Sequence, residues 1–131
     1  MSITTGIVAK ITAASTTAAA RIYPKVLPHD CTLPAVTYQR ITTERVRSHT
    51  GPSGLAFARF QVNSWAATYA AAEALAIEIR TALDNGVGTW DSIDVQMCDL
   101  VDEDDLEAVA LEGTSRIRHG IRQDYRIHHA E

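Results

Sequence analysis

The spacing of apolar and polar residues changes twice between Leu33 and Leu83, and it predicts a strand, a loop, a second strand and a helix in that order. Ala35 to Thr43 alternates apolar with polar residues and is rich in Val, Thr, Tyr and Ile, which is typical of a strand. Phe57 to Trp65 alternates again. From Thr68 to Leu83 the apolar residues recur at helical spacing, so this segment is the strongest predicted helix.

The flanking segments add one helix and two strands to this unit. Ser2 to Ile22 has apolar residues at helical spacing, and Pro24 should end that helix. Thr89 to Val101 predicts a third strand, and Arg116 to Ile127 predicts a fourth. The resulting order is helix, strand, strand, helix, strand, strand. It predicts an α+β two-layer sandwich, in which an antiparallel or mixed four-stranded sheet is covered by two helices.

The segment from Glu44 to Ala56 is read as a long hairpin loop of about thirteen residues, which exceeds the usual length of such loops. It carries Arg45, Arg47 and His49 ahead of a Gly-Pro-Ser-Gly stretch. Long loops in compact domains are often functional, so these three residues are the best candidates for contacts with a neighbouring protein. The alternative is a solvated loop without a partner.

The last predicted strand places arginines on one face and apolar residues on the other. Arg116, Arg118, Arg122 and Arg126 share a face, where they repel one another unless acids offset them. The acidic run Asp99–Glu112 could reach them if the third and fourth strands form a hairpin. Alternatively, the arginine face lies at a subunit interface or lines the lumen of a ring.

Charge is distributed unevenly along the chain. At 131 residues the chain is long enough for one domain, 1–131, and its net charge is −4. Residues 1–67 hold seven Lys or Arg and two acids, whereas residues 68–131 hold five Lys or Arg and fourteen acids. The two halves attract each other, either within one subunit or between neighbours in a head-to-tail ring, which requires two different complementary surfaces.

The sequence offers little for catalysis or for metal binding. His128 and His129 are adjacent in a strand and point to opposite faces, so they are poorly placed to chelate one metal. The acids 102–105 lack the spacing of a calcium loop. Neither a nucleotide-binding nor a hydrolase motif occurs, so we expect no cofactor, no metal and no catalytic residues. We also expect no membrane segment and no secretory signal.

Several short pieces, in their order and spacing, resemble the tail completion proteins of long-tailed bacteriophages, also called tail terminator or tail-to-head joining proteins. The resemblance runs from about Tyr23 to His128. Its pieces are Tyr23-Pro24, Leu27-Pro28, Leu33 to Tyr38, Gly51 to Ala56, Phe60 to Val62, Trp65-Ala66, Thr68-Tyr69 with Ala71, Glu73, Ala74 and Leu75, and Gln123 to Ile127.

The resemblance implies a structural virion protein without catalytic residues or cofactors. Such a protein is made in the bacterial cytoplasm and sits at the tail–head junction. There it forms a ring, usually of six subunits, that caps the head-proximal end of the tail tube, stops tube growth and joins the tail to the head. Its partners are further copies of itself, the tail tube protein and a head-completion or connector protein, and DNA passes through the lumen as non-specific cargo.

On this reading Arg45, Arg47 and His49 contact another subunit or the tail tube, and Arg118 and Arg122 lie at an interface or in the lumen. Two alternatives remain open at the level of sequence. One is another connector of the same neck, such as a head-closure or stopper protein. The other is a small cytoplasmic α+β enzyme with its active site on the polar face of the sheet.

Overall fold

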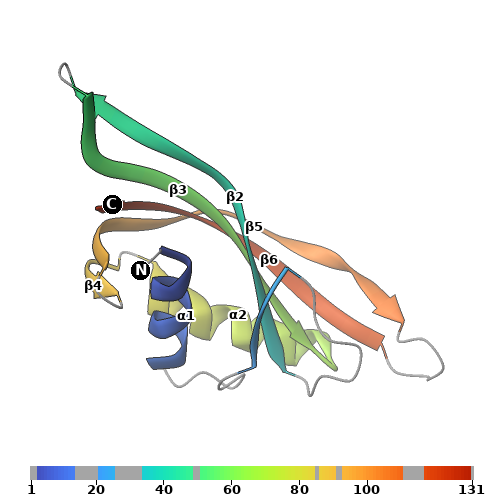
Figure 1. The fold of residues 1–131 in the computed structure, drawn as a ribbon. Coiled ribbons are helices and arrows are strands. Elements are labelled where there is room, and N and C mark those ends of the chain that lie inside the picture. Colours follow the sequence, from blue (N-terminus) through green and yellow to red (C-terminus); the bar gives the residue numbers. More distant parts are fainter. Residues whose placement is uncertain are drawn as a thin grey trace.

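A six-stranded sheet and two helices make up the fold, seen in a computed structural model that describes residues 3–13, 21–25, 34–48, 51–84, 86–90, 93–110 and 117–130 (Figure 1). Along the chain the elements are α1 (Ile3–Ala13), β1 (Ile22–Pro24), β2 (Ala35–Ser48), β3 (Gly51–Ala66), α2 (Tyr69–Leu83), β4 (Gly88–Trp90), β5 (Ile93–Ala110) and β6 (Ile117–Ala130).

The strand order across the sheet is β1-β2-β3-β6-β5-β4. All neighbours are antiparallel except β1 and β2, so the sheet is mixed. The predicted fold, a four-stranded sheet covered by two helices, is therefore wrong. The sheet has six strands, is curved, and extends well past the helices (Figure 1). The sequence missed β1 and β4 because each has three residues, too few for an alternating pattern to emerge.

Both helices lie against one face of the sheet, which we call the inner face; the opposite face is the outer face (Figure 1). In α1 the residues Ile3, Ile7 and Ile11 recur one turn apart and are buried. The predicted helix over 68–83 is confirmed as α2, which begins after Thr68, whose side-chain oxygen accepts a hydrogen bond from the Ala71 amide at 3.2 Å.

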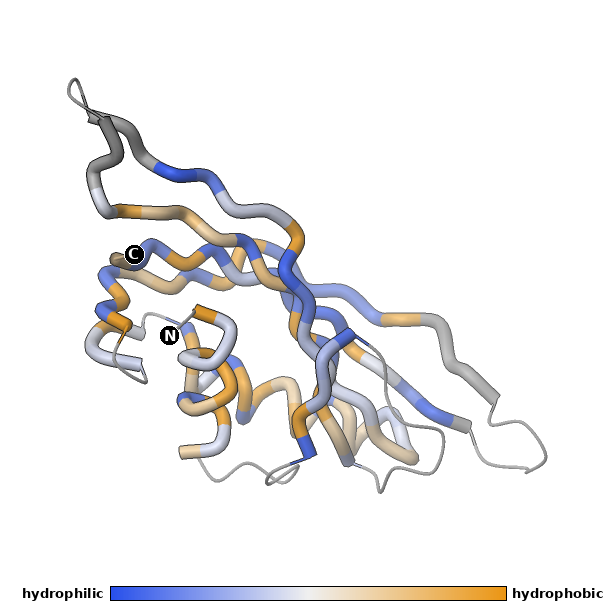
Figure 2. Tube along the Cα trace, in the orientation of Figure 1, coloured by the Kyte–Doolittle hydropathy of each residue, from blue (hydrophilic) through white to orange (hydrophobic). Residues whose placement is uncertain are grey.

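The hydrophobic core lies between these helices and the inner face. Alternate residues of the central strands point into it, and Figure 2 shows apolar residues recurring along the helices and the strands beside them. Its largest fully buried side chains are Tyr125, Phe60, Ile7, Ile11, Leu75, Ile79, Leu83 and Ile127.

The predicted long loop over Glu44–Ala56 is wrong, because most of this segment belongs to two paired strands. Glu44 lies opposite Phe57, Arg45 opposite Ala56, and Ser48 opposite Gly51. The polar residues and the Gly-Pro-Ser-Gly stretch suggested a loop, but pairing with the neighbouring strand supplies the backbone hydrogen bonds that local propensity does not foresee. The result is a β2–β3 hairpin that extends past the helices (Figure 1).

The acidic segment also differs from the prediction. The single strand expected over Thr89–Val101 is divided into β4 and β5, and β5 continues through the acidic run to Ala110. The β5–β6 hairpin extends past the helices in the direction opposite to the β2–β3 hairpin (Figure 1). Figure 2 shows the hydrophilic stretch of β5 where it leaves the helices.

The first helix is shorter than predicted. α1 ends at Ala13, and Ile22 lies in β1, where it pairs with Val36, so the expected continuation of the helix to Ile22 is wrong. Neither of the helices in the described part of the chain has the length and apolar character needed to cross a membrane.

Candidate assembly surface

The outer face of the sheet carries polar and charged side chains, and it is built by the strands that also build the core. Because side chains alternate across a strand, Phe60 and Val62 of β3 are buried on the inner face while Arg59, Gln61 and Asn63 lie on the outer face. In β6 the same alternation buries Tyr125 and Ile127 and puts the arginines on the outer face.

Ion pairs between strands occupy the middle of this outer face. Arg122 of β6 lies directly opposite Asp104 of β5, and its guanidinium donates to both Asp104 oxygens at 2.8 Å. It also reaches Asp102 at 3.4 Å. The hypothesis that the acidic run offsets the arginines of the last strand is therefore confirmed for Arg122. Since these side chains are substantially exposed, each pair adds at most about 1 kcal/mol to stability.

A second ion pair is better shielded from water. Arg59 of β3 donates to Asp124 of β6 at 3.1 Å, and the Asp124 side chain is only 8% exposed. The other carboxylate oxygen, Oδ1, is buried and has no hydrogen-bond partner among the described residues. Removing Arg59 would leave a shielded carboxylate without its cation, which is more costly than losing a surface pair.

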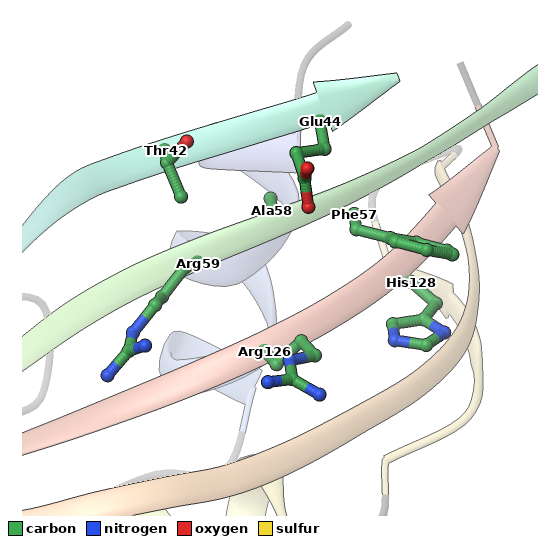
Figure 3. A pocket seen from close by; sticks show the side chains of 7 residues that line it. All are labelled: Thr42, Glu44, Phe57, Ala58, Arg59, Arg126 and His128. Atoms are coloured by element: carbon green, nitrogen blue, oxygen red, sulfur yellow. The ribbon is translucent and has the colours of Figure 1, made fainter. Parts of the chain in front are cut away.

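A pocket of about 400 Å³ opens beside this pair, where β2, β3 and β6 run together (Figure 3). Its lining is made by Thr42, Glu44, Phe57, Ala58, Arg59, Arg126 and His128. The rings of Phe57 and His128 stack at 4.2 Å between centroids and form one wall. Two guanidinium groups and an aromatic wall suit an acidic or planar side chain of a protein partner better than an apolar ligand.

Trp65 lies on the outer face at the end of β3 that is away from this pocket. Its indole nitrogen donates to the Thr37 hydroxyl at 3.0 Å across the β2–β3 ladder. Its ring lies over Gly120, where an added Cβ would come within 2.8 Å of two ring carbons. A side chain larger than hydrogen at this position would therefore displace the indole.

Gln123 is the centre of a hydrogen-bond network on the inner face. The Gln123 amide donates to the Ala76 carbonyl at 3.0 Å and to the Glu103 carboxylate at 2.8 Å, and it accepts from the Tyr125 hydroxyl at 3.0 Å. These bonds tie α2 to β5 and β6. Burial raises the pKa of Tyr125 well above its ordinary value, with Cys98 and Asp84 adding to the rise.

Cys98 is the free cysteine of the described residues, and it lies on the inner face of β5. Burial raises the pKa of its thiol to about 12, and the nearby carboxylates of Asp84 and Asp99 add to the shift. A thiol with so high a pKa is almost entirely protonated at neutral pH and is a poor nucleophile. Within the described part of the chain, no group of three or more His, Cys, Asp or Glu residues could hold a metal ion.

The residues selected from sequence fall at opposite ends of the sheet. Arg45 is exposed on the β2–β3 hairpin, opposite Ala56. Arg47 is part of β2, with its backbone opposite Pro52, but its side chain and all of His49 lie outside the described residues. Arg118 is half-buried at the start of β6, with a buried Nε that has no hydrogen-bond partner among the described residues.

Sequence reasoning missed the Arg59–Asp124 pair and the Phe57–His128 stack. Alternation does place Arg59 on the polar face of β3. It does not reveal that β6, rather than another strand, lies beside β3, and both contacts depend on that pairing. They join residues far apart in the chain, so spacing gives no signal for them.

Comparison with known proteins gives one family and a shared fold. The family model described as "Tail completion protein gp17" matches residues 7–126. Among solved structures, a chain from "Virion of native gene transfer agent (GTA) particle" is similar with a TM-score of 0.62 and 19% sequence identity, over 92% of this chain and 84% of that one. No curated protein matches the chain.

Proposed function

We propose that this chain, which belongs to the tail completion protein gp17 family, assembles as a ring that caps the head-proximal end of the tail tube. Family membership makes it a structural protein of the virion tail. The finer role, which is the proposal, is to stop tube polymerisation and to present the surface that joins the tail to the head.

The observation that best supports capping is the division of the sheet into two faces. The inner face is filled by α1, α2 and the core, so it is occupied by the fold itself. The outer face is polar and charged, and the strands that form it extend beyond the helices at both ends (Figure 1). A protein whose work is contact with other subunits needs such an exposed surface and no catalytic group.

The proposed contacts follow from this geometry. Arg45 and Arg47 belong to the β2–β3 hairpin, and with His49 they are proposed to contact the next subunit or the tail tube protein. Arg118 and Arg122 are proposed to lie at an interface or in the lumen through which DNA passes. Because Arg122 is already paired with Asp104 and Asp102, its side of the lumen would have little net charge, which suits non-specific passage of DNA.

Deleting the gene from its source element tests the capping role. After induction, the lysate is imaged by negative-stain electron microscopy, with a complemented deletion as the matched control. Capping predicts tails of uncontrolled length beside separate DNA-filled heads. Tails of normal length that fail to join heads would instead identify a connector of the neck, and normal joined particles would remove the tail role.

A further inference from the structure

Two long strand edges have a neighbour on one side only among the described strands. β1 covers β2 at Val36, Thr37 and Tyr38, so the edge over 39–48 stays open beyond it. At the other side of the sheet β4 covers β5 at Ile93, Asp94 and Val95, which leaves the edge over 96–110. In the β5 segment the Leu100 amide donates to the Asp84 carboxylate and the Glu103 amide to the Asp102 carboxylate, each at 3.0 Å. An open edge otherwise presents N–H and C=O groups without a strand partner, and these are a template for pairing with another strand.

The two open edges carry opposite charge. Residues 39–48 contain three Arg and one Glu, while residues 96–110 contain six acids and no Lys or Arg. Residues 101–105 of β5 are exposed, and so is Arg45 of β2. Edges that must avoid association are usually short or similarly charged, whereas these two are long and complementary.

The directions of the strands also fit a head-to-tail contact. β2, β3, β6 and β5 are antiparallel in succession, so β2 and β5 run in opposite directions. A second copy placed beside the first, in the same orientation, would therefore bring its β2 antiparallel to the first copy's β5. The all-antiparallel order of the four long strands would then continue from one copy to the next.

The two edges lie on a diagonal, because β1 covers the start of β2 and β4 covers the start of β5. Across the sheet, Glu44 of β2 is level with Met97 of β5, through the paired residues Phe57 and His128. The acids 102–105 centre on Glu103, about six residues further along β5. Placing Arg45 of one copy beside these acids of the next shifts each copy by roughly 20 Å along the strand direction. The same step moves it about 19 Å across the sheet, which is the width of four strands. This step tilts the strands by about 45°, close to the tilt at which sheets close on themselves.

We propose that the open edge of β2 in one copy pairs with the open edge of β5 in the next copy, with Arg45 beside the acids 102–105. The contact is heterologous, so repeating it generates a ring or a helix rather than a closed dimer. This inference rests on the proposed ring and names the surfaces that join its subunits. Added salt weakens the contact, since the facing charges are at the protein surface.

Carbodiimide cross-linking of tails carrying Arg45→Lys tests the pairing directly. This reagent joins an amine to a carboxylate in contact with it, and arginine does not react. The unaltered protein, which retains Lys10 and Lys25, is the matched control. We expect a ladder of covalently joined copies only with Arg45→Lys, and peptide mapping should join position 45 of one copy to the acids of β5 in another.

A ladder equal to that of the unaltered protein, or a cross-link that maps elsewhere, would overturn the proposal. If Arg45→Lys yields too few tails for cross-linking, exchanging the charges of the two edges provides a second test. Arg45→Glu should reduce the yield of complete particles, and adding Asp105→Arg, at an exposed position outside the Gln123 network, to the same chain should restore it. Failure of that rescue counts against edge pairing alone, whereas a normal phenotype of the gene deletion counts against the capping role.

Discussion

The two faces of the sheet use the same four long strands for different purposes. On the inner face Phe60 and Tyr125 are fully buried against the helices. On the outer face the same strands carry Arg59, Asp124 and Arg122 in ion pairs between strands. Burial of large apolar side chains contributes about 1.5–3 kcal/mol each, whereas exposed ion pairs contribute at most about 1. Stability therefore depends mainly on the inner face, and the outer face is available for assembly.

The largest expected difference in stability between the two faces is between substitutions of two phenylalanines of β3. Phe60→Ala should lower the free energy of unfolding by about 3–5 kcal/mol, because the side chain is 0% exposed and its loss leaves a cavity. Phe57→Ala is the matched control on the outer face, where the ring is 38% exposed, and should cost about 1 kcal/mol. Urea unfolding followed by circular dichroism measures both free energies. Equal losses of stability for the two variants would contradict the conclusion that the inner face supplies most of the stability.

One point of the outer face is packed as tightly as the core. Gly120→Ala should cost about 1–3 kcal/mol of unfolding free energy, because its methyl group would overlap the Trp65 ring. Adding Trp65→Leu should recover part of this loss by making room for the methyl group. A neutral Gly120→Ala in the same urea experiment would show that the indole moves aside freely.

Alkaline pH tests the burial of Cys98 on the inner face. Its thiol has a pKa raised to about 12 in the fold, against an ordinary 9.0, so above pH 9 the unfolded chain loses a proton that the folded chain retains. The Cys98 thiol should lower stability by about 1 kcal/mol between pH 9 and pH 10, and Tyr125, whose pKa is also raised in the fold, adds a smaller decline that grows above pH 10. Cys98→Ala should lower stability at neutral pH but remove most of the decline between pH 9 and pH 10, and an unchanged decline would assign it to other groups.

The smallest expected effect on stability is at Arg122, on the outer face. Arg122→Gln should change the free energy of unfolding by at most about 1 kcal/mol, and 1 M NaCl should largely remove the difference. If the outer face serves assembly, the same substitution should lower the yield of joined particles when it complements the gene deletion. A loss of stability as large as that of Phe60→Ala would show that Arg122 contributes to stability as much as a core residue does.

The sequence alone determined which residues point inward. Alternation in 57–65 and 116–127 and helical spacing in 68–83 follow from the geometry of single elements, and the burial of Phe60, Tyr125 and Ile79 agrees with them. Family membership could also be recognised from short pieces in order. These features depend on residues close together in the sequence, or on short pieces taken in order, so they can be recognised without knowledge of the fold.

Only the tertiary structure decided the extent and the order of the strands. Glu44–Ala56 and the acidic run beyond Val101 lack the composition of strands, yet each is paired across a hairpin. Acids in β5 are stabilised there because Arg122 lies opposite Asp104, and Asp124 lies beside Arg59 because β6 pairs with β3. Such pairings join distant residues, and their free energy appears only when both strands are in place, so no local pattern records them.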